Sequence, residues 1–506
     1  MVWPFGIFGS KAVAPERVPT DEVIPLFERD DTATNKGISL EFSMIFDEVL
    51  DADKLSGALW KLLEKPGWRK LGARLRYNDK GKLDYHVPAQ YTKERPPFNY
   101  THLVETKPFS QHRIGANFPT LTGKVQVLDA LGHARVLTDE ESTKKSLEDW
   151  TLHDVGQLGL HILSFPDTTV VSITWLHTLL DAMGRHALLL AWRAVLDGRD
   201  NDVPPFVGYD SDPLAKLGTS STALKEVSMK PYLLSKLGML RFVSNMVYEL
   251  YWYPTEEGRM LIVPAAEFSK IKAEAFADLD SLSPDKITYT TTEPRKPFLS
   301  DGDIGTAWFM RLYARSNPEI ANSYPQRLIS VMNVMGMRDI VRSSEPKLLP
   351  PAHEGAYIHN CITASFTIMP ISDFLSLPLG HVAARIRSDL VTQSSRPHLE
   401  ASQRDAAGGK TVLYGSGDMV LVTLTNWAKA KLYETDFGAA RKDGGQGKAV
   451  PRFIQPWAVT PSLPLRGSGN CVGKDKHGNW QFGVLMKKEL IDGFVREVER
   501  IGGERS

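Results

Sequence analysis

Two residues, His177 and Asp181, have types and a spacing that could carry out acid–base chemistry. They lie in the segment Trp175-Leu-His177-Thr-Leu-Leu-Asp181-Ala-Met-Gly184. An imidazole near its unperturbed pKa of about 6.5 can accept a proton at neutral pH. If the turn is helical, a carboxylate at this spacing shares its face and can fix its geometry or raise its basicity. Taken alone, the pair is more typical of a structural histidine than of a catalytic one.

Motifs of several other enzyme classes are absent from the sequence. There is no His-Glu-x-x-His, Gly-x-x-x-x-Gly-Lys-Ser/Thr or Cys-x-x-Cys, so metalloprotease, P-loop and zinc sites lack their ligands. The Gly-Ser-Gly runs at 415–417 and 467–469 do not match the Gly-x-Ser-x-Gly nucleophile elbow. Cys361 and Cys471 are single cysteines, which we expect to be small core residues and not nucleophiles. No metal site is predicted.

The elements around His177 must place it at the end of a strand. Residues 158–165 and 168–175 form a predicted pair of strands joined by Pro166-Asp167, and the second runs straight into His177. Residues 184–197 then have the pattern of a buried helix. The predicted order is therefore strand, sharp turn with His177 and Asp181, and helix.

Further elements are predicted in both halves of the chain. The patterns favour a mixed α/β protein with two comparable lobes. The predicted boundaries are an N-terminal lobe over 1–200, a crossover connector over 201–264 and a C-terminal lobe over 265–506. The predicted strands are 39–46, 73–77, 83–87, 327–334, 419–424 and 480–486, and the predicted helices are 51–63, 265–276 and 303–314.

Composition narrows the possible partners and the compartment. The 506 residues include 60 Lys+Arg and 60 Asp+Glu, and no basic stripe is evident, so nucleic acid is not an expected partner. Two cysteines are too few for a disulfide scaffold and suit the cytoplasm, where we place the protein. The apolar start is interrupted by Pro4 and Gly6, which argues against a signal peptide. We expect a monomer.

Residues 233–253 are apolar and aromatic, with interspersed Lys, Arg and Glu. Such a helix can lie on a membrane or a partner. Helices packed against their own protein are commoner, and that is our expectation here.

Read together, several segments resemble the BAHD acyltransferases, and in particular their fungal branch that includes the trichothecene acetyltransferases. His177-Thr-Leu-Leu-Asp181 resembles the family's HxxxD motif. Thr425-Asn-Trp427 and Asp436-Phe-Gly438 resemble its Thr-Ser-Trp and Asp-Phe-Gly segments, in the expected order. Weaker landmarks lie at 304–308, 331–333 and 350–360, and the resemblance covers most of residues 20–500.

The resemblance implies two chloramphenicol-acetyltransferase-like lobes, each a mixed sheet with flanking helices, around a channel. It implies acyl-CoA as co-substrate, with no bound cofactor, and a small alcohol or amine as acceptor. His177 would be the general base, Asp181 would hold the turn, and Arg338 would pair with Asp181. We expect Thr425 to donate to the oxyanion and Trp427 to line a pocket. Asp436 and Gly438 would be structural.

This sequence departs from the family pattern at Ala182, where Gly is usual after the Asp. Gly184 is expected to supply the flexibility that Ala182 lacks. Met335 stands where an Arg is expected, so Arg338, three residues later, is the nominated partner of Asp181. After Asp436-Phe-Gly438 the chain continues Ala-Ala-Arg-Lys instead of the usual Trp-Gly-Lys-Pro.

Three alternatives stay open. The scaffold could carry another reaction, such as a condensation, a cyclisation or transfer from a carrier-bound thioester, because a fold does not fix a function. The chain could be a non-catalytic binding or regulatory protein. It could also act at a membrane through residues 233–253. The sequence does not identify the acyl group, the acceptor or the pathway.

Overall fold

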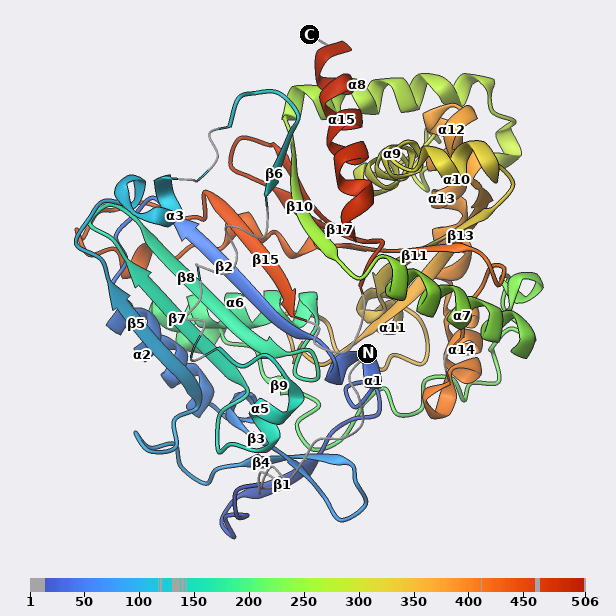
Figure 1. Cartoon of the computed structure of the whole chain (residues 1–506). Helices are drawn as coiled ribbons and strands as arrows, with labels where there is room; N and C mark the ends of the chain where they lie inside the picture. The colour runs from blue at the N-terminus through green and yellow to red at the C-terminus, as the bar shows by residue number, and fades with distance from the viewer. Residues whose placement is uncertain are drawn as a thin grey trace.

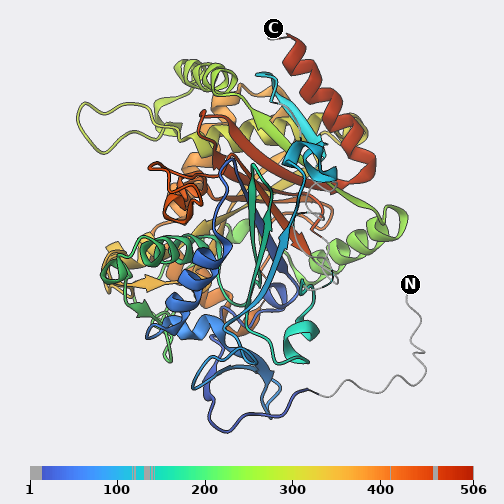
Figure 2. The same ribbon diagram turned by 90° about the vertical axis from the view of Figure 1, so that its left-hand side faces the viewer.

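The computed structural model describes residues 14–504, apart from 117, 119–120, 130–136, 138–140, 142, 411 and 460–464. Its two main sheets lie in two lobes, each with helices packed against its sheet (Figure 1). The C-terminal helix α15, Lys488–Glu504, and a small three-stranded sheet lie at opposite ends of the molecule (Figures 1 and 2). The predicted mixed α/β, two-lobe fold is confirmed.

The N-terminal lobe contains a five-stranded sheet. Its strands, in spatial order, are β15 Phe453–Val459, β2 Ser39–Phe46, β8 Thr169–Leu176, β7 Leu158–Ser164 and β5 Phe98–Val104. Helices α2, Ala52–Glu64, and α6, Ala182–Leu196, bury their apolar faces against it. The β-branched run of β8 suits a strand buried on both faces, and all eight of its residues are buried.

The C-terminal lobe contains a seven-stranded mixed sheet. Its strands, in spatial order, are β13 Ile362–Pro370, β11 Leu328–Gly336, β14 Val420–Asn426, β16 Ser468–Lys474, β17 Trp480–Lys487, β10 Glu256–Val263 and β6 Gln126–Asp129. Its core also includes residues of α8 Ala265–Ala277, α9 Asp301–Arg315, α13 Leu379–Gln393 and α15.

Smaller elements complete the fold. A three-stranded sheet has the order β1 Glu22–Pro25, β4 Leu83–Val87 and β3 Arg74–Tyr77, and a two-stranded one pairs β12 Ala356–Tyr357 with β9 Phe206–Val207. Short helices include α1 Ala33–Lys36, α3 Arg113–Ala116, α5 Leu147–Thr151, α10 Pro318–Ser323, α11 Arg338–Ser343, α12 Ile371–Ser376 and α14 Arg396–Asp405.

The two sheets exchange strands between the halves of the sequence. β15 comes from the C-terminal half but pairs with β2 of the N-terminal lobe. β6 comes from the N-terminal half but pairs with β10, which itself falls within 201–264 and pairs with β17. The lobes are therefore not contiguous segments, because pairing across long sequence distances completes both sheets.

Helix α7, Lys236–Trp252, lies over the C-terminal lobe and has no buried residue. Its inner side is held by polar contacts, such as Asn245 Nδ2 to the carbonyl oxygen of Gly417 at 3.0 Å. Its outer side exposes a stripe of apolar side chains. These are Leu237, Leu240, Val243, Val247, Tyr248, Tyr251 and Trp252. The helix fits the sequence pattern and contacts its own C-terminal lobe through half-buried residues such as Phe242 and Asn245, but most of its large apolar side chains face outward.

Candidate active site

The predicted strand, turn and helix around His177 are present. β8 ends at Leu176, residues 177–179 form a turn, and α6 begins at Ala182. Asp181 is the N-cap of α6, with extended backbone angles, and its Oδ1 accepts from the Gly184 backbone N–H at 2.9 Å. His177 and Asp181 are therefore not on one helical face, which corrects the geometry expected from their spacing.

Hydrogen bonds to its backbone fix this turn at several points. The N–H of His177 donates to the carbonyl oxygen of Ile38 at 2.9 Å, and Asn360 Nδ2 donates to the carbonyl oxygen of His177 at 2.8 Å. The Tyr85 hydroxyl donates to the carbonyl oxygen of Thr178 at 3.1 Å. These hydrogen bonds restrict the backbone of residues 177 and 178, from which the imidazole projects.

Asp181 forms a two-point ion pair with Arg338, the first residue of α11. Nη1 and Nη2 of Arg338 lie 2.8 and 2.9 Å from Oδ2 and Oδ1 of Asp181. The Cys361 backbone N–H also donates to Oδ2 at 2.9 Å, and Arg338 reaches the carbonyl oxygens of Tyr357 and His359. Asp181 thus ties the start of α6 to α11 and to the segment 357–361.

Asp181 and Arg338 both keep their charge although they are buried. Burial alone would raise the pKa of Asp181, but the charge and hydrogen bonds of Arg338 and two backbone N–H groups outweigh it and lower that pKa. Burial acts to lower the pKa of Arg338, and Asp181 more than compensates and raises it. Both groups are ionised at neutral pH.

The imidazole of His177 is partly exposed and stays neutral at physiological pH. Burial lowers its pKa below the usual value, against the raising effects of its own backbone carbonyl, Asp181, Asp30 and Asn360. Its Nδ1 is buried and has no hydrogen-bond partner. A neutral imidazole has one nitrogen that can accept a proton.

Gly184 is needed for close packing and not for flexibility. A Cβ on Gly184 would lie 2.0 Å from the carbonyl oxygen of Ile358. Ala182, in the first turn of α6, adopts ordinary helical geometry, so the absence of Gly there leaves the turn formed. At the start of α6, glycine is therefore required at position 184, where the backbone of Ile358 packs against it.

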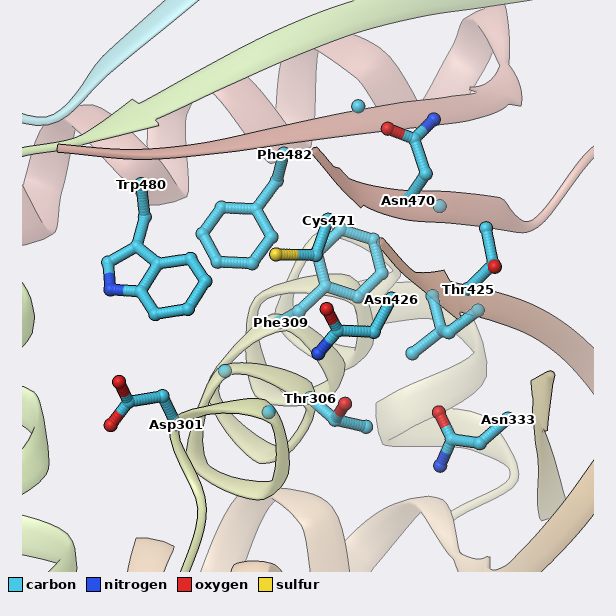
Figure 3. Close-up of a pocket in the computed structure, with 15 residues that line it drawn as sticks. Asp301, Thr306, Phe309, Asn333, Thr425, Asn426, Asn470, Cys471, Trp480 and Phe482 are labelled. Carbon is cyan, nitrogen blue, oxygen red and sulfur yellow. The ribbon is translucent and has the colours of Figure 1, made fainter. Parts of the chain in front are cut away.

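Thr425 and Trp427 lie at the end of β14 in the C-terminal lobe. Thr425 lines a pocket between the sheet and α9 together with Asn333, Asn426 and Asn470, as Figure 3 shows. Trp427 is half-buried against the core of the N-terminal lobe, and the Arg185 guanidinium carbon lies 4.8 Å from the centre of its ring. No contact between either residue and His177 is among those described.

Arg185 of α6 is a buried cation without a carboxylate partner among the described residues. Its guanidinium carbon lies 4.0 Å from the ring centre of Phe42 and 5.8 Å from that of Trp175. Its Nε and Nη2 make no hydrogen bond. Burial lowers its pKa to about 9, which still leaves it charged at neutral pH. No motif or spacing in the sequence distinguishes Arg185 from other helical arginines.

The Asp-Phe-Gly segment packs against α6 and not in the pocket of Figure 3. Asp436 Oδ1 accepts from the N–H groups of Gly438 and Ala449 at 2.9 Å, and its Oδ2 lies 3.4 Å from Arg193 of α6. A Cβ on Gly438 would lie 2.4 Å from the carbonyl oxygen of Gly447. These contacts anchor a loop to the helix that follows Asp181.

The two cysteines do not offer a thiolate nucleophile, and the described residues hold no group arranged as a metal site. Burial raises the pKa of Cys361 and of Cys471 to about 12, so both thiols are protonated at neutral pH. In the part of the chain that the structure describes, no group of His, Cys, Asp and Glu is arranged to hold a metal ion. No described helix is long and apolar enough to cross a membrane.

Curated proteins related to this chain are fungal and span nearly its whole length. The acetyltransferase adrJ of Penicillium rubens is 30% identical over 512 residues, which is 98% of this chain and 99% of the relative. The acetyltransferase sphE of Aspergillus fumigatus is 33% identical over 511 residues, 96% of each. The calD protein of Penicillium decumbens, named a transcriptional regulator, is 34% identical over 496 residues. The match covers 95% of this chain and 96% of the relative. No protein-family model matches.

Solved structures share the fold at low identity. The TRI101 protein of Fusarium sporotrichioides, complexed with coenzyme A and T-2, has a TM-score of 0.62 and 14% identity, and the match covers 94% of this chain and 97% of that one. Vinorine synthase has a TM-score of 0.54 and 12% identity, with 97% and 95% covered. With these relatives and this fold, the chain belongs to the BAHD-type acyltransferases, in their fungal branch.

Proposed function

We propose that the chain transfers an acyl group from acyl-CoA to a hydroxyl, or an amine, of a small specialised-metabolite acceptor. The observation that carries this proposal is a neutral, partly exposed His177 on a turn that the Asp181–Arg338 ion pair holds. Relatives named acetyltransferase support the reaction class, and a structural neighbour with coenzyme A and T-2 supports the donor and the size of the acceptor.

His177 would act as the general base. It takes the proton of the acceptor as the acceptor oxygen attacks the thioester carbon, and it returns a proton to the departing thiolate. A positioned base of this kind contributes about 10²- to 10⁴-fold to the rate. Asp181 transfers no proton, because Arg338 and two backbone N–H groups occupy its oxygens.

The pocket beside Thr425 would receive part of the acyl-CoA. Its lining is rich in neutral amide side chains, including Asn333, Asn426 and Asn470. The Asn470 Oδ1 is buried and has no hydrogen-bond partner, so it offers an acceptor to an incoming N–H group. The pantetheine arm of coenzyme A carries two amides. Thr425 remains our candidate donor to the oxyanion.

The test is acceptor-dependent release of free thiol from a panel of acyl-CoAs. We expect release by the wild-type chain and none above background by His177→Ala, with both proteins folded. Wild-type rates in His177→Ala would refute the assignment of the base.

A regulatory role is a second candidate, and the name of calD favours it. It requires no thiol release with any donor and acceptor. A chain that binds coenzyme A but releases no thiol across the panel would support this role over catalysis.

A membrane-associated form of the same activity is favoured by the outward apolar stripe of α7. Tyr and Trp side chains suit the interface between water and lipid. Flotation with neutral liposomes tests it, with Leu240→Lys and Val247→Lys as a matched double variant. Failure of the wild-type chain to float would remove this candidate.

A further inference from the structure

A cavity of about 210 Å³ lies beneath α7, at one end of the C-terminal sheet. Its lining includes Val420 at the start of β14, Ser468 at the start of β16 and Lys487 at the end of β17. β14 and β16 are parallel and β17 is antiparallel to β16, so these strand ends lie together. The pocket of Figure 3 lies at the opposite end, where β14 finishes with Thr425 and Asn426. The two described linings share no residue, so the cavity under α7 is a separate site.

Much of the lining of this cavity is apolar. α7 covers the cavity, and none of the residues of this helix is buried. Apolar side chains that face an unfilled space lack packing partners, and a ligand that covers them gains the free energy of burial. A cavity of about 150 Å³ is large enough to bind benzene. The apolar lining includes Phe242, Met246, Ile320, Met419, Leu421 and Leu465.

Three cationic side chains also line the cavity, and together they exceed the nearby carboxylates by one charge. Arg466 pairs with Glu256 at 3.1 Å, and Lys487 Nζ lies 3.7 Å from Oε1 of Glu249. The third cation, Arg327, has no carboxylate at ion-pair distance in the part of the chain that the structure describes. Its positive charge is left for a ligand to match.

The guanidinium of Arg327 is half-buried and anchored on one side. Its Nε donates to the backbone carbonyl oxygen of Asp418, whose carboxylate pairs with Arg241 at 3.0 Å. No hydrogen bond of either Nη of Arg327 is among those described. A guanidinium presents parallel N–H groups that match the two oxygens of a carboxylate. Tyr313 also lines the cavity, and burial raises its pKa, so its hydroxyl keeps its proton as a further donor.

We propose that the cavity under α7 binds a small carboxylate with an apolar body, such as a medium-chain fatty acid. Arg327 binds the carboxylate, and the apolar side chains between α7 and the sheet bury the chain. A wholly apolar ligand leaves Arg327 unmatched, and a free phosphate leaves the apolar lining uncovered. The site goes beyond the proposed acyl transfer, because it lies apart from Thr425 and requires no acyl-CoA.

The experiment is calorimetric titration of the full chain with octanoate, compared with acetate and with octan-1-ol. We expect saturable binding of one octanoate per chain. Acetate should bind at least about a hundredfold more weakly, because it lacks the apolar chain. Octan-1-ol should bind about tenfold more weakly, because it lacks the charge that Arg327 matches. Equal affinities for octanoate and octan-1-ol would refute a carboxylate site.

Arg327→Gln tests the position of the carboxylate. It removes the unmatched cation and should weaken octanoate binding about tenfold. Lys488→Gln is the matched control, since it removes one positive charge from the residue next to Lys487. Lys488 is exposed, lies 3.7 Å from Glu257 and does not line the cavity. This variant should bind octanoate as the wild-type chain does.

If Arg327→Gln does not fold, Lys487→Gln gives a second test. It leaves Glu249 facing the cavity without its cation, and the repulsion should also weaken octanoate binding about tenfold. No saturable binding of octanoate to the wild-type chain would overturn the proposal. So would an octanoate affinity that falls as much in Lys488→Gln as in the variant of the cavity. The titration needs no acyl-CoA, so failure of the thiol-release test would refute the proposed function alone.

Discussion

His177 gains its chemical character from its surroundings more than from its spacing to Asp181. The ring is partly exposed, burial lowers its pKa, and hydrogen bonds hold the turn beneath it. Asp181 lies in a separate network with Arg338. The two residues of the motif therefore divide their tasks, with proton transfer proposed for one and structure for the other.

The lowered pKa of His177 predicts the pH dependence of transfer. In the proposed mechanism the neutral form is the base, and the lowered pKa lets it persist as the pH falls below the usual histidine pKa of about 6.5. We expect kcat/KM to be level near neutral pH and to decline only below about pH 6.5. Initial rates of thiol release across pH test this, and a limb centred above pH 7 would contradict it.

Asp181→Asn is expected to cost stability as well as activity. It leaves the buried Arg338 without its counter-charge, at a cost of about 3–5 kcal/mol in the free energy of unfolding. His177→Ala removes no ion pair and should change stability far less. Denaturant unfolding of both variants measures these changes. A free energy of unfolding of Asp181→Asn equal to that of the wild type would contradict a structural role of the Asp181–Arg338 ion pair.

The same ion pair predicts how stability depends on acid. The folded pKa of Asp181 is lower than the unfolded value of about 3.9, so its contribution is complete above that value. It is lost as the pH falls through the folded pKa. Between pH 5 and 2, the loss of unfolding free energy should be smaller in Asp181→Asn than in wild type; equal losses would exclude a contribution from this pair.

At the scale of elements, the start of α6 is locked by its contact with residue 358. Gly184→Ala would place a Cβ 2.0 Å from the Ile358 carbonyl oxygen, and overpacking of this kind costs about 1–3 kcal/mol. Gly57→Ala on α2 is the control, since nothing lies within 4 Å of its new Cβ. It should stabilise by about 0.5–1 kcal/mol. Equal unfolding midpoints for the two variants would contradict this account.

Elements with strong local patterns could be predicted from the sequence. β2, α2 and α6 lie where their periodicity places them, and Asp51 is the N-cap of α2. β6, β10 and β15 were missed, because each is defined by a partner far away in the sequence. α7 was predicted as a helix, but no local pattern reveals which face another element covers.

The site could be predicted only in part, for the same reason. The resemblance led to Arg338, and the structure pairs it with Asp181. Asn360 is the last residue of the landmark at 350–360, to which the sequence assigns no role. Arg185 could not be predicted, because an isolated Arg in a helix carries no functional signal by itself. The contacts of both residues arise from chain segments that only the fold brings together.

At the scale of the whole molecule, the exchanged strands make each lobe depend on the other half of the chain. Residues 1–200 lack β15, and residues 265–506 lack β6 and β10. Each fragment would leave a sheet edge unpaired. We expect neither fragment to unfold cooperatively when produced alone, as measured by circular dichroism during thermal unfolding. A cooperative transition in the 1–200 fragment would show that this lobe is autonomous.

The central claim is acyl transfer by His177 between two bound substrates. Its most direct test is single-turnover thiol release from acyl-CoA by the wild-type chain and by His177→Ala, each with and without an acceptor. The account predicts release that requires the acceptor in the wild-type chain and that is lost in the folded variant. Acceptor-dependent release that persists at the wild-type rate in His177→Ala would contradict it.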